Sequence, residues 1–153
     1  MNSILFMCCF LVSSLGMAQE TFNKAQAIEI INTFFDGFHK GDTLVMRSVI
    51  GEDVTLQSVF ADKEGYNHLR GGSMDEFIEA IAKRPEDQKW KEKLLDYKVQ
   101  IDGNLAHVWT PYEFWLNGNF SHCGANAFTL AKTDDGWKII HLIDSRRKSS
   151  CKE

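Results

Sequence analysis

Two tight turns in the last third of the chain limit the possible folds more than any other feature. The first is Asn117-Gly118, which lies between two aromatic-rich runs within residues 105–147. Both central residues of a type I′ turn need positive φ, which Asn and Gly adopt readily. The pair therefore predicts a hairpin with a two-residue loop, and in that register Glu113 lies opposite His122.

The second turn is Thr133-Asp134-Asp135-Gly136-Trp137. It predicts a three-residue loop with Gly136 in the left-handed conformation, which pairs Thr133 with Trp137 and, further along, Asn126 with Asp144. Side chains alternate across a strand, so the two hairpins sort three strands into two faces. A slip of one residue in the second hairpin would exchange Asp144 for His141 on the first face.

That first face combines aromatic side chains with a few convergent polar and ionisable groups, a composition typical of small-molecule pockets. We therefore expect a ligand-binding pocket there. The opposite face is small and apolar, which favours close packing against another layer or subunit. The candidate ligand-binding residues are Trp109, Glu113, Trp115, Asn126, Phe128 and Arg146, and the candidate catalytic residues are Asp144 and His122.

The first 18 residues predict a cleavable secretory signal peptide. An apolar run from Ile4 to Val12 is followed by Gly16-Met17-Ala18, and small residues in this spacing predict cleavage after Ala18. The run is too short to span a bilayer comfortably. No Lys or Arg precedes it, and lipid modification of Cys8 or Cys9 is the rival interpretation. We expect a secreted or periplasmic domain, residues 19–153, without membrane attachment after cleavage.

Net charge and cysteine content indicate which partners and which covalent bonds to expect. The formal net charge of −4 and the pI of about 5.7 leave no basic stripe for nucleic acid. Only Cys123 and Cys151 remain after signal cleavage, and an even pair in an oxidising compartment predicts one disulfide. Two free thiols are the alternative, because Cys123 pairs with Arg147 in the expected register and the tail must turn back to bring Cys151 near it.

The segments before the hairpins predict the order helix, helix, strand, helix. Apolar spacing and capping residues mark the helices, and alternation marks the strands. Together with the hairpins this order predicts one α+β domain with helices on one face of a curved sheet. The expected segments are helices over Asn23–Lys40, Thr43–Val49 and Ser73–Arg84, a strand over Asp53–Phe60, a loop over Ala61–Gly72, a charged connection over Pro85–Lys93 and a strand over Leu94–Asp102.

Three of these stretches resemble the nuclear transport factor 2-like superfamily, namely Phe38-His-Lys-Gly41-Asp42, Glu52-Asp53-Val54-Thr55 and the closing run from Phe128 to Ile140. From Asn23 to Arg147 the chain is most similar to the secreted SnoaL-like and lumazine-binding-like bacterial members. The resemblance implies a cone, in which a curved, mostly antiparallel sheet is closed by about three helices around a ligand cavity. It also implies frequent homodimers through the outer face of the sheet.

Two functions from different classes follow. The first is a secreted small-molecule-binding domain that holds a partly apolar ligand in the cone. The second is a cofactor-independent isomerase, cyclase or dehydratase, activities that the superfamily includes, with Asp144 as base and His122 as acid. Arg146 would hold the Asp144 carboxylate ionised, and Glu113 would tune His122.

A purely structural arrangement of the same residues is the competing interpretation: an Asp144–Arg146 salt bridge and a hydrogen-bonded Glu113–His122 pair. A third role, structural or in protein interaction, would have side chains filling the cone. We expect no cofactor and no metal. His107, His122 and His141 lie on successive strands, but only the first two share an expected face, and several residue pairs separate them.

Overall fold

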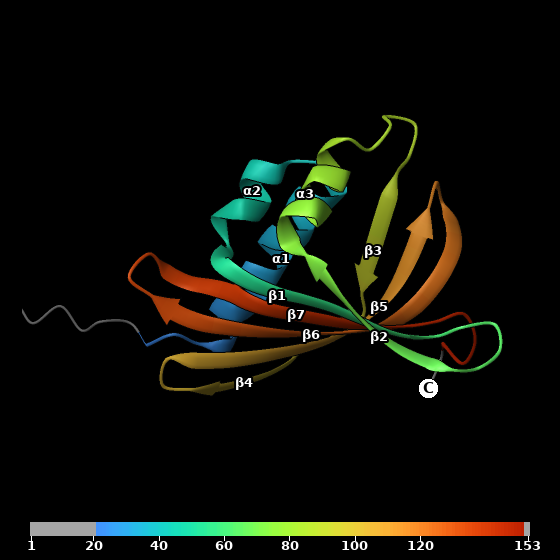
Figure 1. Cartoon of the computed structure of the whole chain (residues 1–153). Helices are drawn as coiled ribbons and strands as arrows, with labels where there is room; N and C mark the ends of the chain where they lie inside the picture. The colour runs from blue at the N-terminus through green and yellow to red at the C-terminus, as the bar shows by residue number, and fades with distance from the viewer. Residues whose placement is uncertain (1–20, 152–153) are drawn as a thin grey trace, which may run out of the picture.

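The computed structural model describes residues 21–151, so the expected signal peptide lies outside the described residues. Within this range the chain forms three helices and one seven-stranded sheet (Figure 1). None of the helices in the described part is both long and apolar enough to cross a membrane. The elements are α1 (Lys24–Lys40), α2 (Thr43–Ser48), β1 (Ile50–Ala61), β2 (Asn67–Ser73), α3 (Met74–Ala82), β3 (Trp90–Leu94), β4 (Lys98–Asp102), β5 (Leu105–Leu116), β6 (Asn119–Thr133) and β7 (Gly136–Arg147).

The sheet is mostly antiparallel and strongly curved. Its strand order is β2-β1-β7-β6-β5-β3, β4 also pairs with β5, and only β1 and β7 run parallel. β4 pairs with residues 105–109 of β5 and β3 with residues 112–116, so β5 changes partner around Pro111. Figure 1 shows the three helices on one face of the sheet, with β3 and the ends of β5 and β6 rising beside them. This is the predicted α+β architecture.

The helices begin where the sequence predicts and end within two residues of the predicted positions. Asn23 caps α1 in a capping box with Gln26, and Gly41 ends the helix with a φ of 73°. Asp42 accepts hydrogen bonds from the first turn of α2, and the Ser73 hydroxyl accepts one from the Glu76 N–H in α3. These short-range contacts fix each helix boundary without tertiary help.

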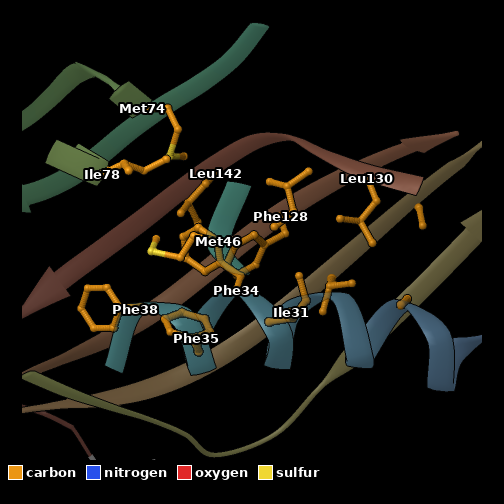
Figure 2. Close-up of a cluster of buried hydrophobic side chains, with 14 of the residues drawn as sticks. Ile31, Phe34, Phe35, Phe38, Met46, Met74, Ile78, Phe128, Leu130 and Leu142 are labelled. Carbon is orange, nitrogen blue, oxygen red and sulfur yellow. The ribbon is translucent and has the colours of Figure 1, made fainter. Parts of the chain in front are cut away.

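One face of α1 makes the centre of the core. Its buried residues recur at helical spacing and point toward the strands in Figure 2. Phe34 and Phe35 pack edge-on against Phe128 of β6, with ring centroids 5.9 and 6.0 Å apart. Met46 of α2 and Ile78 of α3 complete the same cluster. The apolar stripe of α1 therefore joins all three helices to the inner face of the sheet.

Three segment predictions were wrong. The strand expected over Leu94–Asp102 is interrupted at residues 95–97, so β3 ends at Leu94 and β4 begins at Lys98. Residues 67–72, expected as part of a loop, belong to β2, an edge strand that pairs with β1 and is exposed along its whole length. A strand with neither face buried carries no alternation of apolar and polar residues. Residues 90–94, expected at the end of a charged connection, form β3, where Trp90, Glu92 and Leu94 are less exposed than the two lysines between them.

The first hairpin follows the predicted register only next to its turn. Asn117 and Gly118 have φ of 51° and 78°, and Trp115 pairs with Phe120 as expected. A β-bulge follows on β6, so that Phe114, and not Glu113, pairs with His122. Every later pair is shifted by one residue, which turns the predicted outer side chains of β5 inward. The inner residues of β5 are Val108, Thr110, Tyr112 and Phe114.

The second hairpin shows the opposite pattern. At its turn Thr133 pairs with Gly136, not with Trp137 as predicted. A second irregularity, between Thr129 and Leu130, restores the predicted register farther from the turn. Asn126 therefore pairs with Asp144, and this prediction is confirmed.

The predicted disulfide is present. Cys123 on β6 and Cys151 in the tail are bonded, with their Cα atoms 5.7 Å apart. Ser150 adopts a φ of 54° and its carbonyl accepts a 3.0 Å hydrogen bond from the Arg147 Nε. This tight turn brings the tail back to β6.

Removing the disulfide should destabilise the domain without changing its fold. Because the bond closes a loop with a sequence separation of 28 residues, the C123S/C151S double variant should lose about 3 kcal/mol of unfolding free energy. Urea denaturation followed by tryptophan fluorescence measures this loss, with the reduced wild type as the matched comparison. Equal midpoints for oxidised and reduced protein would contradict it.

Candidate functional site

A cavity of about 360 Å³ lies between α1, α3 and the inner face of the sheet. Its volume is within the range of small-molecule sites. Aromatic and aliphatic side chains form most of the wall, and polar groups from five strands gather at one end. The apolar lining is Phe34, Phe35, Phe38, Leu56, Phe77, Ala80, Trp90, Phe114 and Leu142, and the polar lining is Ser58, Glu92, Tyr112, His122, Asn126, Asp144 and Arg146.

Asp144 is the centre of one polar cluster. Its carboxylate pairs with Arg146, whose Nε lies 2.6 Å from Oδ2. The Tyr112 hydroxyl donates to the same oxygen over 3.2 Å, and the Ser58 hydroxyl donates to Oδ1. Burial, followed by the nearby negative charge of Asp144, raises the pKa of Tyr112, so this phenol stays protonated. The predicted Asp144–Arg146 salt bridge is thus present, and two hydroxyls fix it in place.

Gly124 allows this cluster to form. A Cβ atom at this position would lie 1.7 Å from the Ser145 carbonyl oxygen and 2.9 Å from Cε1 of Tyr112. The missing side chain lets the tyrosine lie against β6 with its hydroxyl 3.1 Å from the Ser145 carbonyl, so the single phenolic proton lies between this oxygen and Oδ2 of Asp144. A glycine inside a strand here marks a close approach of backbone and ring.

Glu92 and Asn126 form the second polar cluster. The Asn126 Nδ2 donates a 2.6 Å hydrogen bond to Oε1 of Glu92. Burial raises the pKa of Glu92 to about 8, and the hydrogen bond from Asn126 opposes this shift without cancelling it. Within the described residues, Oε2 of Glu92 has no hydrogen-bond partner. At neutral pH the carboxyl is therefore mostly protonated and has one oxygen free for a ligand.

His122 lies on β6, pairs with Phe114 and lines the same cavity. Its ring stacks on Phe114 with centroids 4.9 Å apart, and Nδ1 lies 3.1 Å from the Ser121 hydroxyl. Burial, reinforced by the charge of Arg146, lowers the pKa of His122, so the imidazole is neutral at pH 7. In the part of the chain that the structure describes, Nε2 makes no hydrogen bond and can meet a ligand as donor or acceptor.

The structure brings together only part of the predicted site. Asp144, His122, Asn126 and Arg146 line the cavity. His141 lies on the other face, with Nε2 3.1 Å from the Gln57 side chain, so the alternative register of the second hairpin is wrong. Phe128 is fully buried in the core and is not part of the cavity lining.

The placement of Trp109, Glu113 and Trp115 in the pocket was wrong. The bulge on β6 puts all three on the outer side of β5, where Trp109 is 41% exposed. Glu113 does not pair with His122. Its Oε2 lies 3.3 Å from the Trp115 indole nitrogen and 4.0 Å from the Lys93 amine.

Sequence reasoning missed three polar residues of the lining, Ser58, Glu92 and Tyr112. Glu92 had a signal, because Trp90-Lys91-Glu92-Lys93-Leu94 alternates as a strand that buries every second residue. Tyr112 was missed because the predicted register placed it on the opposite face of the sheet, and the bulge on β6 shifts that register by one residue. Within residues 21–151 no group of three or more His, Cys, Asp or Glu side chains is arranged to hold a metal ion.

The raised pKa of Glu92 makes stability depend on pH in a defined direction. An ordinary glutamate has a pKa of 4.5, so between about pH 4.5 and 8 the unfolded chain has lost a proton that the folded chain keeps. Stability from this group is full below that window and falls as pH rises through it, by at most about 1.4 kcal/mol per pH unit.

The Glu92→Gln variant, which cannot titrate, should therefore gain unfolding free energy relative to the wild type from about pH 5 to 8. Urea denaturation across this range measures the difference. Glu64→Gln, at an exposed glutamate in the β1–β2 turn, is the matched control and should show no such trend. A constant difference between Glu92→Gln and wild type would contradict the raised pKa.

Comparison with known proteins agrees with the fold described above. The sequence profile of a family described as "Putative lumazine-binding" matches residues 23–142. No protein with a curated description is similar enough in sequence to count as a match.

Solved structures show the same fold at low identity. A nuclear transport factor 2-like protein of Cytophaga hutchinsonii is 12% identical, with a TM-score of 0.63 over 82% of this chain and 100% of its own. A superfamily protein of Salmonella enterica is 20% identical, with a TM-score of 0.59 over 82% and 92% of the two chains. A protein of Streptomyces avermitilis, described as a "putative dehydratase", is 17% identical, with a TM-score of 0.60 over 80% and 94%. The chain therefore belongs to the family described as "Putative lumazine-binding", and it shares the fold of these nuclear transport factor 2-like proteins.

Proposed function

We propose that this protein binds a small, partly apolar molecule in the cavity between its helices and its sheet. The observation that carries the proposal is the pairing of an aromatic wall with polar atoms that have no partner in the described part of the chain, Oε2 of Glu92 and Nε2 of His122. Unpaired polar atoms at the end of an apolar cavity favour a ligand that brings its own hydrogen-bonding group.

Family membership supports the same class of ligand. The family description names lumazine, a small molecule with flat rings, and flat rings pack well against aromatic side chains. Phe38, Phe77, Trp90 and Phe114 supply such surfaces in this cavity.

The protein's compartment belongs to the proposal as well. Secretion or a periplasmic location stays a prediction from residues 1–18, which lie outside the described part. The Cys123–Cys151 disulfide supports it, because structural disulfides persist in oxidising compartments.

Native mass spectrometry tests the proposed function. Protein purified from an oxidising compartment without denaturation should carry a reproducible organic molecule. Ala80→Trp places a large ring at the cavity lining on α3 and should reduce ligand occupancy about tenfold, the effect of about 1.4 kcal/mol of lost binding. Ala82→Trp, an exposed position of the same helix outside this cavity, should leave occupancy unchanged.

Two results would count against binding in the cavity. One is wild-type protein that is always free of small molecules and takes up none from a cell extract. The other is equal loss of ligand in both tryptophan variants, which would point to a ligand held elsewhere.

Catalysis is the alternative function, with Asp144 as base and His122 as acid. The position of His122 in the cavity favours it, whereas the lowered pKa of this residue leaves the ring neutral, without the readily donated proton that an acid needs. Against it, the Asp144 oxygens already accept hydrogen bonds from Ser58, Tyr112 and Arg146, which restricts their access to a substrate proton. If the protein is an enzyme, Asp144→Asn should keep the ligand and abolish turnover. If it only binds, the same variant should weaken affinity.

Homodimerisation through the outer face of the sheet is the remaining part of the proposal. The half-buried Ala127 and Ile143 lie side by side on that face, next to the 41% exposed Trp109. Ala127→Arg should convert a dimer into a monomer, because it places an unpaired charge in an apolar contact. Size-exclusion chromatography with light scattering measures the mass, with Asn104→Arg in an exposed turn as the control. A wild-type monomer would refute the dimer.

A further inference from the structure

We propose that the ligand carries a cationic amine on an apolar, ring-bearing body, and that its ammonium group lies beside Glu92. This inference rests on the proposed function and specifies the chemical class of the ligand. It follows from the charges of the cavity, from the accessible surface of the free carboxyl oxygen and from the rings around it.

The cavity has one more acidic group than cations. Arg146 is ion-paired with Asp144, so the two charges offset each other. Glu92 has a hydrogen bond only from the neutral Asn126 side chain, and among the described residues no Lys, Arg or His lies within ion-pair distance of it. An ammonium group from a ligand would compensate the charge that Glu92 gains when it ionises.

The second carboxyl oxygen of Glu92, Oε2, keeps some accessible surface. Across the described residues, no buried polar side-chain atom of a residue that is not exposed lacks a partner. Oε2 makes no hydrogen bond there, so it must have accessible surface, and Glu92 lines the cavity. A cation in the cavity can therefore reach this oxygen directly.

Aromatic rings adjoin the same carboxyl group. Trp90 precedes Glu92 by two residues and lies on the same side of β3. Phe114, on the neighbouring strand β5, pairs with Glu92. Phe38 completes the wall, with ring centroids 6.0 Å from Trp90 and 6.5 Å from Phe114. Ring faces attract desolvated cations, and this attraction favours an ammonium over a neutral group at this position.

Among the described residues, the other titratable groups near Glu92 do not provide it with a positively charged partner. The Nε2 atom of His39 accepts a hydrogen bond from the backbone N–H of Glu92 at 3.0 Å, and burial lowers the His39 pKa to about 4, so it is uncharged. β1 and α3 contribute only Ser58, Leu56, Phe77 and Ala80. The titratable groups that face Glu92 are His39 from α1, Tyr112 from β5, His122 from β6, and Asp144 and Arg146 from β7.

Binding of an ammonium group should release a proton. With a pKa of about 8, Glu92 is mostly protonated in the empty cavity at pH 7, and it must ionise to pair with the cation. Its proton passes to solvent. Affinity should therefore rise about tenfold per pH unit below pH 8 and level off above it. A neutral ligand that accepts a hydrogen bond from protonated Glu92 would show the reverse, with affinity falling above pH 8.

Isothermal titration calorimetry with three probes of matched shape separates these cases: tryptamine, tryptophol and indolepropionate, which carry a cation, an alcohol and a carboxylate on the same indole. Tryptamine should bind most tightly at pH 8, with the pH dependence described above and release of about one proton at pH 7 in buffers of different ionisation enthalpy. Equal or tighter binding of tryptophol or indolepropionate would overturn the cation preference, as would binding of none of the three.

Two variants complete the test. Glu92→Gln keeps an oxygen for the Asn126 hydrogen bond but has no charge, so it should weaken tryptamine binding at least about tenfold at pH 8 and abolish its pH dependence. A near-UV circular dichroism spectrum that matches the wild type shows that the variant keeps its packed core. Glu64→Gln makes the same charge change on an exposed turn and should have no effect. An unaltered tryptamine affinity in Glu92→Gln would overturn the proposal, while a ligand found by mass spectrometry would still uphold binding in the cavity.

Discussion

The burial of the aromatic face of α1 against the curved sheet is the interaction on which the rest of the structure depends. Phe34 and Phe35 pack edge-on against Phe128 and also line the cavity. Toward the end of the helix, β5 exchanges β4 for β3, and Phe38 meets Trp90 of β3 and Phe114 of β5. The same stripe of aromatic residues thus stabilises the core and forms one wall of the site.

One inserted residue decides which side chains of β5 reach that site. The bulge on β6 shifts the pairing by one, and because side chains alternate, it moves Tyr112 and Phe114 inward and Trp109 outward. Gly124 then leaves room for the Tyr112 ring beside β7. The geometry of the Asp144 cluster is therefore a consequence of a local irregularity in the sheet and of an absent side chain.

The two acidic residues of the cavity, Asp144 and Glu92, have different surroundings. Asp144 has a cation and two hydroxyl donors from neighbouring strands, so its charge is compensated inside the protein. Glu92 has only an amide and apolar surroundings, and its raised pKa reflects the cost of an uncompensated charge. One carboxyl group organises the site, while the other is available to a ligand. This division explains why ligand binding has more support here than a mechanism with Asp144 as the base.

The sequence by itself determined the α+β class, the helix boundaries at Asn23 and Gly41, the turn at Asn117-Gly118 and the pairing of Cys123 with Cys151, because capping, turn geometry and periodicity are short-range properties. It also placed Asp144, Asn126, His122 and Arg146 at the site, since the register of the second hairpin holds beyond its turn. Only the tertiary structure decided the face of β5, the existence of β2 and the environment of Glu92. A bulge has no compositional signal in one strand, an exposed edge strand has no apolar pattern, and the hydrogen bond between Glu92 and Asn126 joins residues 34 positions apart. Those features arise from contacts between strands, which a single chain's local pattern does not contain.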